Sequence, residues 1–63
     1  MRDLDPLYNE ALEIVKEEKQ GSVSMLSRRL RVGWLRASNI IDQLEAMGVI
    51  GKNDGASPRK LLT

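Results

Sequence analysis

Residues 31–48 read Arg31-Val32-Gly33-Trp34-Leu35-Arg36-Ala37-Ser38-Asn39-Ile40-Ile41-Asp42-Gln43-Leu44-Glu45-Ala46-Met47-Gly48. The pattern predicts a tight turn that opens into a helix of about four turns, ending at a glycine. Apolar residues recur at helical spacing on one face, which we expect to be buried: Trp34, Ala37, Ile40, Ile41, Leu44 and Met47. Leu35, Asn39 and Asp42 fall within about 60° of one another on the opposite face. The helix therefore has one face suited to a core and another that presents groups outward.

A shorter helix is predicted just before this one, over about 24–31. Ser24 is a suitable N-cap for it, and its apolar side comes from three residues: Met25, Leu26 and Leu30. Val32-Gly33 then forms a turn that we expect to need the backbone freedom of glycine. A short helix, a turn and a longer helix make a helix-turn-helix, whose second helix enters the major groove of DNA.

The N-terminal part predicts a first helix over about 6–19. Asp5 is suited to cap it, Pro6 suits its first position, and Gly21 is expected to end it in the left-handed conformation. Its apolar side is formed by Leu7, Tyr8, Ala11, Leu12, Ile14 and Val15. Ser22-Val23-Ser24 is interpreted as a short extended piece, suited to one strand of a small sheet.

The C-terminal part predicts a β-wing over about 49–62. Val49–Lys52 is interpreted as one strand, Asn53-Asp54-Gly55 as a turn and Arg59–Leu62 as the returning strand. The fold class expected is therefore mainly α (small α+β), a winged helix-turn-helix with three helices and a small antiparallel wing. The domain fills residues 1–63.

The composition of this 63-residue chain argues against catalysis. It has no cysteine and no histidine, so disulfides, thiolate metal sites and the commonest general base are excluded. No glycine-rich phosphate loop is present, and the serines are better explained as caps or surface residues. We expect no enzyme activity, no metal and no cofactor. No apolar run approaches the length of a transmembrane helix, so the expected location is the cytoplasm.

Charge is unevenly distributed along the chain, although the net charge is only +1. Residues 1–18 sum to −4, residues 19–41 to +5 without any acid, and residues 42–63 to zero. The central bases are Lys19, Arg28, Arg29, Arg31 and Arg36. A solvated basic surface would explain such a cluster, but arginines beside a turn and a helix start favour binding to DNA phosphates. We assign Arg28, Arg29, Arg31 and Arg36 to DNA backbone contacts.

The outward face of the 34–47 helix carries the candidate base contacts. Asn39 suits bidentate contact with adenine, Asp42 can accept from cytosine N4, and Leu35 can rest on a thymine methyl. The alternative is that all three are ordinary solvent-facing residues and that Asp42 only balances nearby arginines. Trp34 has the chemistry of a base-stacking platform, but its place on the apolar stripe favours core packing. Met25 and Met47 are likewise interpreted as core residues.

Several motifs together also resemble a known family. They are Leu4-Asp5-Pro6-Leu7-Tyr8, Arg31-Val32-Gly33-Trp34-Leu35-Arg36-Ala37, the run from Ile40 to Ile50, and Gly55 through Pro58-Arg59-Lys60-Leu61-Leu62. They are similar, over nearly the whole chain, to the gamma domain of the FtsK/SpoIIIE DNA translocases. The resemblance implies the C-terminal winged helix of a hexameric motor, which recognises short polar sequences on chromosomal DNA and orients translocation toward the dif site.

The resemblance also implies particular residues and partners. The family's base-contacting positions hold asparagine, arginine and glutamate, and here the matching positions are Leu35, Asn39 and Asp42. Arg36 and Arg59 match family arginines, so Arg59 joins the expected backbone contacts. The partners implied are double-stranded DNA, the parent motor and, in some members, a Xer-type recombinase. The expected role is in bacterial chromosome segregation and cell division, at the nucleoid, with a membrane-anchored parent if this is an excised domain.

Two other functions stay open at this stage. The chain can be a free-standing winged-helix regulator with its own DNA target, which the altered outward face favours. It can also be a protein-docking module that binds a recombinase or a motor through the acidic first helix or the wing, because fold alone does not fix function.

Overall fold

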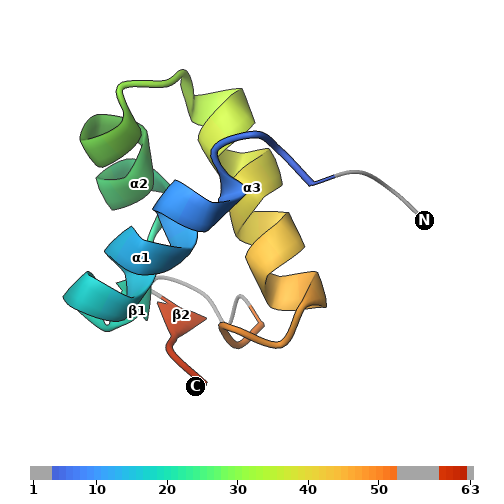
Figure 1. Ribbon diagram of the computed structural model, residues 1–63. Coiled ribbons are helices and arrows are strands. Elements are labelled where there is room, and N and C mark those ends of the chain that lie inside the picture. Colours follow the sequence, from blue (N-terminus) through green and yellow to red (C-terminus); the bar gives the residue numbers. More distant parts are fainter. Residues whose placement is uncertain (1–3, 53–58, 63) are drawn as a thin grey trace.

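The computed structural model describes residues 4–52 and 59–62 of the chain. The elements run α1 (Tyr8–Glu18), β1 (Gln20–Gly21), α2 (Val23–Leu30), α3 (Trp34–Ala46) and β2 (Arg59–Lys60) (Figure 1). β1 pairs antiparallel with β2, Gln20 opposite Lys60 and Gly21 opposite Arg59. The predicted fold class is confirmed: three packed helices with a small antiparallel sheet, as in a winged helix. No helix in the described part of the chain has the length and apolar composition needed to cross a membrane.

The wing is smaller than predicted. Ile50 forms an isolated antiparallel bridge with Leu61, and the Leu62 N–H donates to the Val49 carbonyl at 2.8 Å. The segment 49–52 therefore meets the returning chain through a few hydrogen bonds rather than as a full strand. The predicted turn at Asn53-Asp54-Gly55 and the extension to Pro58 lie outside the described residues.

Both ends of α1 differ from the prediction. The Asp5 carboxylate accepts from the Leu7 N–H at 2.8 Å and the Asp5 carbonyl accepts from the Tyr8 N–H at 2.8 Å, so Pro6 and Leu7 form a turn ahead of the helix. The helix ends at Lys19, which is left-handed with φ 59°, and not at Gly21. The prediction for Gly21 was wrong because the chain turns two residues earlier, at a residue that bears a side chain.

Gly21 has a different reason to be glycine. It lies in β1 beside Ile50, and a Cβ placed on it would be 2.7 Å from the Ile50 Cδ1 atom and 3.1 Å from its Cγ2 atom. Ile50 itself is almost fully buried. The Ile50 side chain can therefore pack this closely on β1 only because Gly21 has no side chain.

The start of α2 and the turn after it also differ from the prediction. Ser22, not Ser24, is the N-cap, and its Oγ accepts from the Met25 N–H at 3.3 Å. The helix therefore occupies most of the piece that was expected to be extended. After α2, the left-handed residue is Arg31 with φ 58°, whereas Gly33 has an ordinary φ of −66°. The turn is closed instead by Ser27, whose hydroxyl donates to the Val32 carbonyl at 2.7 Å.

The core is formed by one face of each helix and the chain that follows α3. It consists of Tyr8, Ala11, Ile14, Val15, Met25, Leu26, Ala37, Ile40, Ile41, Leu44, Val49 and Ile50. The predicted burial of the α3 stripe is thus confirmed for its middle, and that of Met25 is confirmed as well. Gly48, with φ 77°, ends the turn after α3 and directs Val49 and Ile50 into the core.

Trp34 and Met47 were predicted to be buried, and this was wrong. Their exposed fractions are 63% and 60%. Both lie about 70° from the centre of the buried stripe, so they are at its edges. Trp34 opens α3 and Met47 follows its last residue, so at these ends the stripe extends beyond the elements that cover its middle.

Candidate nucleic-acid interface

The outward face of α3 is built as the helical spacing predicts. Leu35, Asn39 and Asp42 are all exposed, and Leu35 is 74% exposed. The opposite side of the same helix holds four fully buried residues, Ala37, Ile40, Ile41 and Leu44. α3 is therefore fixed to the rest of the molecule by one side, and its other side is free to enter a groove.

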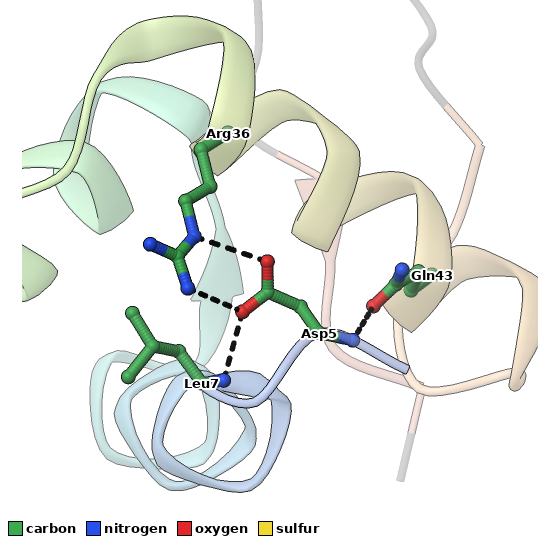
Figure 2. Close-up of polar contacts among 4 residues, drawn as sticks. All are labelled: Asp5, Leu7, Arg36 and Gln43. Carbon is green, nitrogen blue, oxygen red and sulfur yellow. Dashed lines mark hydrogen bonds and ion pairs between the residues drawn. The ribbon is translucent and has the colours of Figure 1, made fainter. Parts of the chain in front are cut away.

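Arg36 lies on one flank of that face and is held by Asp5 (Figure 2). Its Nε donates to Asp5 Oδ2 at 3.1 Å and its Nη2 donates to Asp5 Oδ1 at 3.0 Å. The Asp5 N–H donates to the Gln43 Oε1 at 3.0 Å, two turns further along α3. Hydrogen bonds from Arg36 first, and then from the Leu7 N–H, lower the pKa of the Asp5 carboxyl below its ordinary value of 3.8. The segment before α1 is thus fastened to α3 at two points, near its start through Arg36 and in its second half through Gln43.

Arg29 is also paired, in this case with α1. Its Nη1 lies 2.6 Å from Glu18 Oε2 and its Nη2 lies 2.7 Å from Glu17 Oε1. The hydrogen bond to Glu17 first, and the charges of Glu17 and Glu18, raise the pKa of the Arg29 guanidinium above its ordinary value. All three side chains are at the surface, where such pairs contribute little to stability. A phosphate can therefore compete for Arg29.

Arg59 connects the wing to α3. Its Nη1 lies 2.6 Å from Glu45 Oε1, its Nη2 lies 3.8 Å from Asp42 Oδ1, and its side chain is only 14% exposed. Lys60, next in β2, is exposed, as the alternation of a strand predicts. The two residues thus differ in exposure, and Arg59 is directed at the acids of α3. Asp42 does balance an arginine, the alternative that was considered for it.

Arg28 and Arg31 differ from the other three candidate arginines. Both are exposed, and neither has an ion-pair partner among residues 4–52 and 59–62. Arg28 is in the last turn of α2, and Arg31 is the left-handed residue that follows it. The two free guanidinium groups therefore lie at the turn of the helix-turn-helix, close in sequence to the start of α3.

Sequence reasoning missed the carboxylates that hold the arginines. Asp5 was interpreted only as a helix cap, and Glu17 and Glu18 entered only the summed charge of residues 1–18. The pairs join residues 11, 12, 14 and 31 positions apart, which no helical or strand spacing reveals. The one signal available was the charge balance, since an acidic segment of −4 precedes a basic segment of +5.

Comparison with known proteins adds to this geometry. The model of the FtsK gamma domain family matches residues 2–63. A DNA translocase FtsK from Sporosarcina ureae is 48% identical over 60 residues, 95% of this chain and 8% of that protein. Those from Bacillus cereus and Chlamydia trachomatis are 50% and 45% identical, over 92% and 95% of this chain. The chain spans less than a tenth of the length of these relatives. It belongs to the FtsK gamma domain family.

Proposed function

We propose that this chain binds double-stranded DNA in a sequence-dependent manner, with α3 in the major groove. Its role would be to orient a DNA translocase on polar chromosomal motifs during chromosome segregation. The observation that carries the proposal is the exposed face of Leu35, Asn39 and Asp42 on a helix whose other side is fully buried. Support also comes from the relatives, which are DNA translocases.

The proposed backbone contacts are of two kinds. Arg28 and Arg31 offer complete guanidinium groups to phosphates. Arg29, Arg36 and Arg59 already hold carboxylates, but a guanidinium has five N–H donors. In Arg36 the nitrogen Nη1 takes no part in the two bonds to Asp5, so it can bind a phosphate while Asp5 fixes its direction (Figure 2). Arg59 is the least accessible of the five, and its contact would involve the edge of its guanidinium that faces away from Glu45.

The proposed base contacts follow from side-chain chemistry. Asn39 pairs with the N6 and N7 positions of an adenine, Asp42 accepts from a cytosine amine, and Leu35 packs on a thymine methyl. Each such contact discriminates between bases by about 1–3 kcal/mol. Asp42 lies 3.8 Å from Arg59, a distance that leaves its carboxylate oxygens available to a base.

The proposed role is one of binding rather than catalysis. ATP hydrolysis would belong to the parent motor, and the domain would work at the nucleoid. The parent hexamer and a Xer-type recombinase enter as partners on the resemblance alone.

Salt dependence of DNA binding tests the proposal. A labelled duplex is titrated with the protein by fluorescence anisotropy over a range of salt concentrations, with Arg31→Ala and Lys16→Ala in parallel. Alanine and arginine both have a Cβ atom, so the left-handed conformation at position 31 is similarly unfavourable for either residue. The change therefore removes the charge while the conformational free energy of the turn stays similar. We expect Arg31→Ala to weaken binding to all sequences and to lower the salt slope by about one.

Lys16→Ala is the matched control, since it removes the same charge from the exposed side of α1. It should leave the salt slope at the wild-type value. Equal slopes for the wild type and Arg31→Ala would contradict the phosphate assignment, and an absence of salt-dependent binding by the wild type would contradict DNA binding itself.

A further inference from the structure

We infer that Trp34 is a DNA-contacting residue, which packs its indole against the sugar–phosphate wall of the major groove. The inference rests on the proposed function and adds a contact that is apolar and independent of base sequence.

The first observation is the exposure of this side chain. Trp34 is 63% exposed, although tryptophan is on average one of the most buried residue types. Leu35, beside it, is 74% exposed. Two large apolar side chains are thus presented to solvent together in the first turn of α3. In a helix-turn-helix this is the part of the second helix that contacts the DNA.

The second observation is where Trp34 lies around the helix. The outward face is centred between Leu35 and Asn39, and Trp34 lies about 110° from that centre on one flank. Arg36 lies about 90° from it on the other flank. A helix about 10–12 Å across fills a major groove about 12 Å wide, so both flanks meet the groove walls. Arg36 and Trp34 therefore face opposite strands of the duplex.

The third observation is the charge around Trp34. The first turn of α3 contains no acid, and the exposed Arg31 comes three residues before Trp34. A positively charged surface around the indole favours an anionic partner. The wall of the groove offers deoxyribose carbons for the indole ring and phosphate oxygens for its N–H donor. This combination favours a duplex over an apolar protein surface.

The chain itself supplies the probe for the test. Trp34 is its one tryptophan, so the intrinsic tryptophan fluorescence reports on this position alone. Quenching by acrylamide, which is neutral and therefore not repelled by DNA, is measured with and without a random-sequence duplex. Binding is followed separately by anisotropy of the labelled duplex. We expect the indole to be protected from acrylamide in the complex.

Variants complete the experiment. Trp34→Ala should weaken binding to every duplex about tenfold while leaving the salt slope at the wild-type value, because no charge is lost. Met47→Ala is the matched control, since Met47 follows the last turn of the same helix and is 60% exposed; it should bind as the wild type does. Thermal unfolding followed by circular dichroism verifies that both variants fold.

The failures of the two proposals can be told apart. If the wild type binds the duplex but Trp34 stays fully accessible to acrylamide and Trp34→Ala binds as tightly, the inference is wrong and the proposed function stands. If the wild type binds no duplex at all, the proposed function is wrong and this inference is overturned with it.

Discussion

Asp5 makes more hydrogen bonds than any cap needs. Its carboxylate accepts from the Leu7 N–H and from two nitrogens of Arg36, and its own N–H donates to Gln43 (Figure 2). One short side chain thus fixes the start of α1 and the first turn of α3 relative to each other. Because Arg36 borders the proposed DNA-contacting face, Asp5 also determines the direction in which that arginine points.

The charge of Asp5 predicts a stability that depends on pH. Its pKa is lowered by folding, so the ionised carboxyl stabilises the fold above about pH 4, and this contribution is lost as the pH falls through the lowered folded-state pKa. Asp5→Asn keeps the acceptor for the Leu7 N–H and removes the charge. We expect its melting temperature to be a few degrees below that of the wild type at pH 7.

The difference between Asp5→Asn and the wild type should shrink below about pH 4 and vanish in stronger acid. Glu13→Gln, which changes an exposed acid of α1 without an ion-pair partner among the described residues, serves as the control and should show no such pattern. A difference in melting temperature between Asp5→Asn and the wild type that stays constant from pH 7 to pH 2 would contradict the stabilising role of the Asp5 charge.

The helices show what periodicity can and cannot predict. Their middles follow the apolar spacing, so Ala11, Ile14, Ile41 and Leu44 were assigned to the core correctly. Their ends depend on neighbours that a helical pattern does not include, which is why Trp34 was misplaced. Gly21 and Gly33 were also misjudged, because the left-handed residues at those turns are Lys19 and Arg31, whose conformation is unfavourable for a residue with a side chain and has no sign in the local sequence; Gly48 has a positive φ, at the turn where a glycine was expected to end α3.

The close approach of β1 to Ile50 predicts the effect of a single methyl group. Gly21→Ala would place a carbon 2.7 Å from the Ile50 Cδ1 atom and 3.1 Å from its Cγ2 atom, so the buried Ile50 side chain would have to shift. We expect the free energy of unfolding to fall by about 1–3 kcal/mol. Chemical denaturation followed by circular dichroism measures this.

Gly51→Ala is the control for the same wing. A Cβ at Gly51 would lie 3.9 Å from its nearest neighbours, Leu62 Cδ2 and the Lys60 carbonyl oxygen, which is an ordinary contact. Its effect should be much smaller. Equal stabilities for Gly21→Ala and the wild type would show that the wing does not require glycine at position 21.

At the scale of the whole molecule, the acidic and basic segments fold against each other. Arg29 binds Glu17 and Glu18, and Arg36 binds Asp5. The negative charge of the N-terminal segment and the positive charge of the central segment therefore partly neutralise each other through ion pairs at the surface. Arg28 and Arg31, at the turn before α3, have no ion-pair partner within the described part of the chain. The sequence was sufficient for the fold class and for the outward face, but it could not show which arginines were already paired, because those contacts join distant segments.

The central claim is that the outward face of α3 distinguishes DNA sequences, and selection of bound duplexes from a random pool tests it most directly. The wild type and Asn39→Ala are run in parallel at one salt concentration. We expect the wild type to enrich a short motif and Asn39→Ala to lose the preference for an adenine at one position, a discrimination of about 1–3 kcal/mol. A pool without any enriched sequence, or the same motif from both proteins, would contradict it.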